Sequence, residues 1–440
     1  MQAATWGARL GAEVTLVERD VVGGAANLWD CIPSKAMIAT GGLVTEAARA
    51  QGMGLQPLEA HPDLAALGER VGAITAHLNH SNTVLLESQG IRLIKGAARL
   101  TGAHCVSVDA IDGHHEDLEA EAILISTGSR PRLPEWAPID GERVLTTRQA
   151  YPPKELPSHL IVVGSGVTGV EFVHMFRSFG SKVTLIVSRQ QVLPGKDPEV
   201  AAALEDNFLK SGVVLLKGAR ANGITRVGDE VTVTCEDGRV VKGSHVILAI
   251  GSLPNSEDLG LEEAGVRMDD GGYVPVNQHC VTNLGHVYAA GDVSGRLPLA
   301  SVASMQGRKV AEHVMGLHTR EHRHLDYDKA ASAIFTEPEI ADVGLAEAEA
   351  FAIGRKLRVT KVPFAANARA LIEGDPRGFV KILSDPATGV VLGGSIVGRG
   401  AAELISVLAL AVTANLKVTD IVESLLVHPA LAEALADAAE

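Results

Sequence analysis

One cysteine of this chain stands in a setting that favours an ionised thiol. Cys31 follows the glycine-rich residues 23–30, and it precedes a helix that the sequence predicts to begin at Pro33. The unpaired N–H groups at a helix N-terminus favour a thiolate, and so does the positive charge of the nearby Lys35. A lone cysteine is more often a small buried apolar residue. These surroundings therefore make Cys31 a candidate reactive thiol.

A glycine loop of the dinucleotide-binding type lies near the middle of the chain. Residues 159–163 are expected to form one strand and residues 183–187 a second one. Between them, a helix opens on a loop that carries Gly164, Gly166 and Gly169. Glycines at this spacing allow a tight turn, a close approach of the backbone to a pyrophosphate, and close helix–strand packing. Because strand, loop, helix and strand occur in the required order, the pattern predicts nucleotide binding.

The end of the second strand carries no carboxylate. In NAD-binding units an acidic residue at this place hydrogen-bonds a ribose hydroxyl. Here Val187 is followed by Ser188 and Arg189. A cation without a carboxylate tolerates a 2′-phosphate, so the sequence favours NADPH over NADH. The alternative is that Arg189 is a solvated surface charge.

The first part of the chain repeats this unit in an incomplete form. Residues 10–18 (LGAEVTLVE) nearly match residues 179–187 (FGSKVTLIV). In the first copy, Glu18 supplies the carboxylate that binds a ribose hydroxyl. The corresponding glycine loop would fall ahead of Met1, so we expect the first strand and phosphate loop of this copy to be missing. Either the sequence is truncated or the site is crippled, and we favour truncation because the rest of this copy looks intact.

Further strand ends carry residues suited to a ligand site. Thr127 and Gly128 follow one predicted buried strand, and Gly251 follows another. A third strand ends in Gly291 and Asp292. In folds of this class, ligands bind at the carboxyl edge of the sheet, where such residues lie.

Composition narrows the class of partner. With 39 Lys and Arg against 53 Asp and Glu, the net charge of −14 argues against nucleic acid and anionic membranes. The four cysteines are scattered without metal-ligand spacing, so we expect a reducing, cytoplasmic compartment and no metal. The most apolar run, residues 401–414, is too short to span a bilayer, and we interpret it as a buried helix.

Whole motifs of the chain resemble one enzyme family, the FAD-dependent pyridine nucleotide-disulfide oxidoreductases such as dihydrolipoamide dehydrogenase. The segments GGAANLWDCIPSK, STGSRP, GSGVTGVEF, VYAAGDV and HPALAE occur in the family's order. The resemblance implies an α/β chain with two Rossmann-like nucleotide-binding domains and an α+β dimerisation domain. It places an FAD-binding domain at 1–149, an NAD(P)H-binding domain at 150–278, a central FAD-contacting segment at 279–329 and an interface domain at 330–440.

The resemblance also assigns roles to individual residues. Lys35 and Glu171 would form an ion pair beside the flavin N5. His428 and Glu433 would form an acid/base pair that reaches the flavin of the other subunit, so a homodimer would share its active sites. The residues that bind FAD and NADPH or NADH would be Glu18, Gly24, Thr127, Gly128, Gly291, Asp292, Gly164, Gly166, Gly169, Arg189 and Gly251.

The sequence departs from the family pattern at several positions, and these differences change the function that we expect. The family's redox pair is Cys-x4-Cys, and here Ala26 takes the first position and Cys31 the second. Thiol–disulfide exchange needs both sulfurs, so reduction of lipoamide or glutathione is not expected. Ser301 and Gln306 also replace a usual histidine and a usual acid. The same alanine and a similar LPLASVASMQGR segment occur in a subgroup of actinobacterial NAD(P)H:quinone reductases, which this sequence resembles.

The resemblance therefore predicts a quinone reductase. NADPH or NADH would reduce FAD, and two electrons would pass directly to a small quinone-like acceptor. His428, oriented by Glu433, could supply a proton, and Cys31 would act as a thiol that tunes the flavin. Two alternatives stay open. One is transhydrogenation between NADPH and NAD⁺, and the other is a flavoprotein without catalysis that serves as a redox sensor or binding partner.

Overall fold

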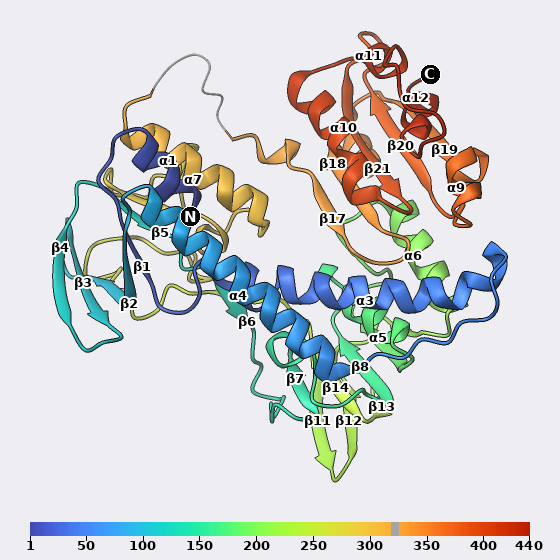
Figure 1. Cartoon of the computed structure of the whole chain (residues 1–440), viewed down its shortest axis with the longest axis horizontal. Helices are drawn as coiled ribbons and strands as arrows, with labels where there is room; N and C mark the ends of the chain where they lie inside the picture. Colours follow the sequence, from blue (N-terminus) through green and yellow to red (C-terminus); the bar gives the residue numbers. More distant parts are fainter. Residues whose placement is uncertain (318–324) are drawn as a thin grey trace. The chain divides into compact units, whose positions relative to one another are not determined.

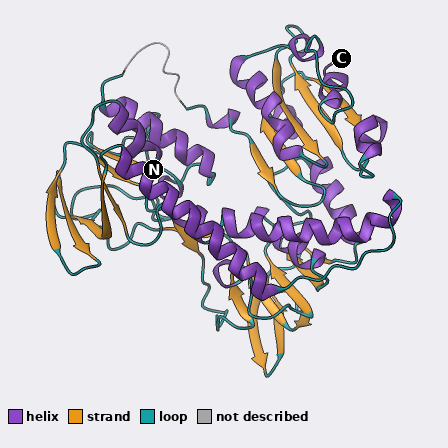
Figure 2. Ribbon diagram, viewed as in Figure 1, coloured by secondary structure: helices purple, strands orange, loops and turns teal. Residues whose placement is uncertain are grey.

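The computed structural model describes residues 1–317 and 325–440 of the chain (Figure 1). Both helices and strands occur throughout the described residues (Figure 2). The chain folds into two compact units, each built from three separate segments of sequence. The first unit comprises Met1–Ser34, Gly68–Arg132 and Gly251–Tyr327, and the second comprises Lys35–Leu67, Leu133–Ile250 and Asp328–Glu440.

The sheets of the first unit are built from β1 (Thr15–Glu18), β2 (Arg92–Leu100), β3 (Cys105–Ala110), β4 (His115–Glu119), β5 (Ile123–Ile125), β6 (Ser129–Pro131), β15 (Ser252–Pro254) and β16 (Val287–Ala289). One sheet has the order β1-β2-β3-β4, in which only β1 and β2 are parallel. Strands β5 and β16 form a parallel pair, and β6 and β15 an antiparallel pair. The strand ends singled out in the sequence, after β1, β5 and β16, therefore all belong to this unit.

Helices α1 (Gln2–Arg9) and α7 (Ala300–Val314) pack against each other in the first unit. The short α2 (Gly24–Leu28) follows β1 along the chain. The Val-, Thr- and Leu-rich residues 14–17 are typical of a buried strand, but Thr15 is exposed and the next three residues are only half-buried. The reason is that β1 pairs with one neighbour, β2, and no second strand of the described residues lies beside it.

The second unit contains a five-stranded parallel sheet in the middle of the chain. It is formed by β7 (Val144–Thr146), β8 (His159–Val163), β9 (Lys182–Val187), β10 (Val214–Lys217) and β14 (His245–Leu248). The order is β10-β9-β8-β14-β7, and all pairs are parallel. The Ile-, Leu- and Val-rich strands β8, β9 and β14 are almost wholly buried, as in sheets covered on both faces. Helices α5 (Val167–Ser178) and α6 (Pro198–Lys210) follow β8 and β9.

The strand order of the parallel sheet can be compared with that of the incomplete copy in the first unit. In the second unit β8 lies between β9 and β14. The counterparts of β9 and β14 in the first unit are β1 and β5, and among the described residues no strand lies between them. The described part of the first unit therefore has no strand at the place that β8 takes in the second unit.

A second sheet and a small meander complete the second unit. The meander is formed by β11 (Ala221–Val227), β12 (Glu230–Cys235) and β13 (Val240–Gly243). The C-terminal part forms an antiparallel sheet in the order β17-β18-β21-β20-β19. Its strands are β17 (Ser332–Ile334), β18 (Ile340–Gly344), β19 (Arg358–Pro363), β20 (Phe379–Ser384) and β21 (Val391–Val397), and its helices are α8 (Glu347–Ala352), α9 (Ala368–Ile372), α10 (Ala401–Ala414), α11 (Val418–Val422) and α12 (Glu433–Ala439).

Helix α10 packs on strands β18 and β21 (Figure 1). Its bounds agree with the sequence prediction, but the expected burial holds for one side of the helix only. Ile405 and Leu408 lie in the core of the sheet, whereas Leu410 is 63% exposed and Val407 38%. Only one side of the helix faces the sheet, so an apolar strip is left on the other side.

Two long helices complete the list of elements. They are α3 (Cys31–Arg49) and α4 (Leu64–Ser88), and each contributes residues to both units. No helix within the described residues is long and apolar enough to cross a membrane. The division of the chain into domains at residues 149, 278 and 329 stays a prediction.

Candidate functional site

The glycine loop after β8 has the geometry of a dinucleotide-binding turn. Gly164 has a positive φ of 110°, and a side chain there would collide with the backbone carbonyl of Ala249. A side chain on Gly169 would collide with the carbonyl of Gly164. Gly166 caps α5 without a side-chain hydrogen bond, and the space where its side chain would stand is open. The free N–H groups of the first turn of α5 therefore fit a pyrophosphate.

The end of β9 lacks a carboxylate, as the sequence indicates. Val187 is buried, while Ser188 and Arg189 are exposed. The carbonyl of Arg189 accepts the N–H of Gly218 at 3.0 Å, which holds the backbone of this loop. Among the described residues, no hydrogen bond or ion pair engages the Arg189 guanidinium. Gly251, assigned to the same cofactor, has a φ of 97°, and its carbonyl accepts the N–H of Arg132.

An ion pair joins α3 to α5 within the second unit. The Lys35 ammonium lies 2.9 Å from Oε2 of Glu171 and 3.1 Å from Oε1. Glu171 is 5% exposed, whereas the Lys35 side chain is 32% exposed. Lys35 and Glu171 therefore form the ion pair that the resemblance predicts. Its ammonium is partly exposed and its carboxylate is buried.

A third residue, which the sequence reasoning missed, holds this pair. The backbone N–H of Phe335 donates to Oε1 of Glu171 at 3.0 Å. The Phe335 ring also lies 4.8 Å from the Lys35 ammonium, within range of a cation–π interaction. No sequence signal could have identified a residue that acts through its main chain, although its place directly after β17 is visible once the sheet is known.

Cys31 is the first residue of α3 rather than a turn residue before it. The predicted start at Pro33 is wrong by two residues, because proline is tolerated throughout the first turn of a helix, where its missing N–H is not needed. The N–H of Ser34 already bonds the carbonyl of Asp30. Cys31 is half-buried, and no disulfide joins any of the four cysteines, all of which are described. Ala26 lies in the preceding helix, α2.

The residues assigned to FAD lie at strand ends of the first unit. Glu18 ends β1, and its Oε1 accepts the N–H of Asp20 at 2.8 Å. Thr127 and Gly128 follow β5. Reciprocal hydrogen bonds tie Thr127 to Asn255: its hydroxyl donates to the Asn255 carbonyl, and the Asn255 amide donates back to the Thr127 carbonyl. Gly24 opens α2 with a φ of 61°.

The turn after β16 presents a second carboxylate. Gly291 has a φ of 75° and a ψ of −159°, a conformation that suits glycine alone. Asp292 begins the short 3₁₀ turn η3 (Asp292–Ser294), and its Oδ2 accepts the Ser129 hydroxyl at 2.6 Å. Carboxylates such as Glu18 and Asp292 accept hydrogen bonds from hydroxyls, so these two acceptors fit the ribose and polyol hydroxyls of FAD.

His428 and Glu433 form a second candidate pair. Nδ1 of His428 lies 2.8 Å from Oε1 of Glu433, and Oε2 accepts the N–H of Ala430 at 2.9 Å. The Ala430 N–H and the His428 ring hold the pKa of Glu433 below its usual value. The His428 side chain is 74% exposed. Glu433 thus orients an accessible imidazole and leaves its Nε2 available, while the reach toward another subunit stays a prediction.

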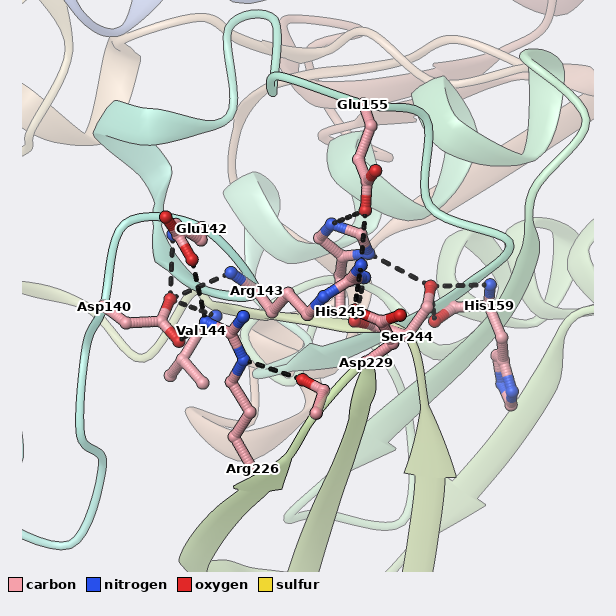
Figure 3. Close-up of polar contacts among 11 residues, drawn as sticks. Asp140, Glu142, Arg143, Val144, Glu155, His159, Arg226, Asp229, Ser244 and His245 are labelled. Atoms are coloured by element: carbon pink, nitrogen blue, oxygen red, sulfur yellow. Dashed lines mark hydrogen bonds and ion pairs between the residues drawn. The ribbon is translucent and has the colours of Figure 1, made fainter.

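A further polar cluster was not predicted, and it lies at the other end of the parallel sheet (Figure 3). Oδ1 of Asp140 accepts the N–H groups of Glu142, Arg143 and Val144, and its Oδ2 binds Arg226 at 2.7 Å. Partial burial acts to raise the pKa of Asp140, but the Val144 N–H, Arg226 and the other two N–H donors lower it strongly.

Buried His245 belongs to the same cluster. Its Nε2 lies 3.4 Å from Glu155, which also pairs with Arg143 at 2.9 Å. Burial and the Arg143 charge lower the pKa of His245. Because His245 opens β14 and Val144 opens β7, the cluster lies at the amino edge, away from the glycine loop at the carboxyl edge. We interpret it as structural.

Comparison with known protein families identifies the family of this chain. The pyridine nucleotide-disulphide oxidoreductase profile matches residues 1–307, and the profile of that family's dimerisation domain matches residues 330–439. The chain belongs to this family. It is an NAD(P)H-dependent flavoprotein oxidoreductase of the dihydrolipoamide dehydrogenase type, with two Rossmann-like domains, and its cofactors are FAD and NAD(P)H. Its dimerisation domain supports a homodimer.

Individual family members are similar over nearly the whole chain. An NAD(P)H dehydrogenase (quinone) of Mycobacterium tuberculosis is 41% identical over 435 residues, covering 97% of this chain and 88% of that protein. A dihydrolipoyl dehydrogenase of Bacillus subtilis is 33% identical, covering 100% of this chain and 93% of that protein. The crystal structure of LpdA from Mycobacterium tuberculosis superposes with a TM-score of 0.94 at 40% identity, covering 100% of this chain and 97% of that chain.

Proposed function

We propose that this flavoprotein passes two electrons from NADPH or NADH to a small quinone-like acceptor without using a redox disulfide. One observation carries the proposal. Ala26 in α2 takes the place of the first sulfur of the Cys-x4-Cys pair, so Cys31 has no exchange partner at that spacing. A dithiol cycle needs both sulfurs. Electrons must then leave the flavin by direct transfer.

The nicotinamide cofactor would bind at the carboxyl edge of the parallel sheet. The open loop at Gly166 and the first N–H groups of α5 would hold its pyrophosphate. The missing carboxylate at Val187 and the unpaired guanidinium of Arg189 favour a 2′-phosphate, so we expect NADPH to bind more tightly than NADH.

The chain supplies charge and a proton around the flavin. When bound, FAD supplies the two-electron chemistry between nicotinamide and acceptor. Lys35, held by Glu171 and Phe335, provides a fixed positive charge for the site. His428, oriented by Glu433, provides an imidazole whose free Nε2 can donate a proton to the reduced acceptor.

The similarity to known proteins supports a quinone as the acceptor class. The Mycobacterium tuberculosis relative at 41% identity carries the name NAD(P)H dehydrogenase (quinone), whereas relatives named dihydrolipoyl dehydrogenase are 32–34% identical. The higher identity to the quinone dehydrogenase thus agrees with the absence of a Cys-x4-Cys pair at Ala26 and Cys31.

Steady-state kinetics with a panel of acceptors tests the proposal. NADPH and NADH oxidation is measured with quinones, with oxidised lipoamide and with an NAD⁺ analogue. We expect the quinone rates to exceed the other two, and the Cys31→Ser variant to retain quinone reduction within about threefold, because the thiol is no shuttle. Lipoamide reduction above the quinone rates would contradict the proposal. Faster transfer to the NAD⁺ analogue would favour a transhydrogenase.

A further inference from the structure

A fully buried glutamine in the first unit has every polar group engaged, yet the proposed mechanism does not use it. Gln306 lies in α7 and is 0% exposed. Its Oε1 accepts the N–H of Gly291 at 2.6 Å. Its Nε2 donates to the Tyr327 hydroxyl at 3.0 Å and to the Ser294 hydroxyl at 3.4 Å. A buried amide satisfied on both sides orients its partners as well as filling space.

The partner of Gln306 is the turn that presents Asp292. Gly291 adopts the glycine-only conformation described above, so its two flanking peptide groups must be held in place. Gln306 holds the N–H before the turn, and the Ser294 hydroxyl donates to the carbonyl after it at 2.7 Å. The Asp292 carboxylate itself is held by Ser129. Gln306 thus contacts the backbone directly before Asp292, while Ser129 contacts its carboxylate.

The far side of Gln306 contacts a second buried set of groups. Burial raises the pKa of the Tyr327 hydroxyl. Burial also raises the pKa of the neighbouring Cys280 thiol to about 11, although the hydrogen bond with Tyr327 opposes this. Both groups are therefore neutral near pH 7, and the Arg296 guanidinium over the Tyr327 ring is the nearby cation. The neutral amide of Gln306 lies between Tyr327 and the Gly291 turn, and it adds no charge there.

We propose that Gln306 is a positioning residue of the FAD site, which fixes the Gly291 peptide and thereby the direction of the Asp292 carboxylate. The inference rests on the FAD-dependent part of the proposed function and not on the identity of the acceptor. The acceptor for the Gly291 N–H is the part of the side chain that the inference requires. A glutamate, the kind of residue usual in the family at this position, could also accept the Gly291 N–H, although its carboxylate could not donate to Ser294.

Three variants separate these contributions. Gln306→Met keeps the length but removes both the acceptor and the donor, and Gln306→Glu keeps the acceptor but adds a charge. Tyr327→Phe leaves the Gly291 contact in place and removes the hydroxyl that contacts Gln306 and Cys280. The readouts are amide hydrogen exchange of the segment 291–294, measured on protein without FAD, and the dissociation constant of FAD. Neither readout depends on a quinone, so a failure of the acceptor assignment leaves this test intact.

We expect Gln306→Met to speed exchange in segment 291–294 roughly tenfold and to weaken FAD binding by a similar factor, because a buried N–H loses its acceptor. Exchange in the parallel sheet of the second unit should not change. Gln306→Glu keeps an acceptor for the Gly291 N–H, so its amide protection and its FAD affinity should both stay closer to those of the unmodified protein than in Gln306→Met. Tyr327→Phe should leave both within about twofold of the unmodified protein.

Two results would overturn the inference. One is a Gln306→Met variant whose exchange and FAD affinity both stay within about twofold of the unmodified protein. The other is a uniform increase of exchange across the whole first unit, because that would assign Gln306 to core packing rather than to the Asp292 turn.

Discussion

At the scale of single residues, the Lys35–Glu171 pair is the best-defined charge of the candidate site. The carboxylate is buried and receives both the Lys35 ammonium and the Phe335 N–H. A carboxylate removed from water is tolerated only when such partners compensate it. Loss of one member of the pair should therefore lower the free energy of unfolding, which can be measured without a cofactor.

Lys35→Met should destabilise the protein by about 2 kcal/mol, because Glu171 keeps only the Phe335 N–H while part of the loss is screened by solvent at the exposed ammonium. The double variant Lys35→Met/Glu171→Gln should lose less than the two single variants together. Denaturant midpoints report both effects. Lys182→Met, at an exposed position of β9, is the matched control and should change stability by less than about 0.5 kcal/mol. Additive losses would mean that the pair does not couple.

The second residue-scale prediction concerns His428. Glu433 stays ionised because the Ala430 N–H and the imidazole lower its pKa, so it orients the ring across the physiological range. His428→Gln should slow quinone reduction by about a hundredfold, because the imidazole that donates the proton is lost. Stopped-flow reduction of the flavin by NADPH should stay unchanged. Unaltered quinone turnover would remove His428 from the mechanism.

At the scale of elements, the parallel sheet separates a binding edge from a structural edge. The glycine loop, Val187 and Arg189 lie at or just beyond its carboxyl ends. The Asp140 cluster lies at its amino ends and fixes the turn that leads into β7 (Figure 3). Substitutions at the two edges should therefore have different consequences, on cofactor binding in one case and on stability in the other.

Asp140→Asn isolates the charge of the structural edge. The folded-state pKa of Asp140 is lowered, so its contribution is present above its unfolded value of about 4 and is lost as the pH falls through the folded value. We expect the variant to be about 0.5–1 kcal/mol less stable at pH 7 and the difference to become smaller near pH 3, where the unfolded chain is already largely protonated at this residue. Thermal or urea unfolding at the two pH values checks this. A difference that is as large at pH 3 as at pH 7 would assign the loss to geometry instead.

Elements were predictable from the sequence where local signals agree with the tertiary setting. The bounds of β8 and α10 follow from their apolar runs, and the loop before α5 follows from its glycines. The exposure of β1 and of Leu410 did not follow, because burial depends on neighbours that local sequence does not encode. Phe335 was missed because it uses its main chain.

At the scale of the whole molecule, the chain contains one complete nucleotide-binding sheet and a second copy in which no described strand lies between β1 and β5. The family profiles and the similar proteins extend across both copies and the C-terminal sheet. The apolar strip of α10, with Leu410 exposed, lies in the dimerisation domain and suits a subunit interface. Sequence motifs identified the family, whereas the acceptor depends on scattered side chains that no motif encodes.

The central claim is that electrons leave this flavoprotein without a disulfide. It is tested most directly by comparing quinone and lipoamide reduction by the unmodified protein and by Cys31→Ser under NADPH. The account predicts that quinone reduction exceeds lipoamide reduction, and that it survives the loss of the thiol within about threefold. Lipoamide reduction that exceeds quinone reduction and disappears in Cys31→Ser would contradict it.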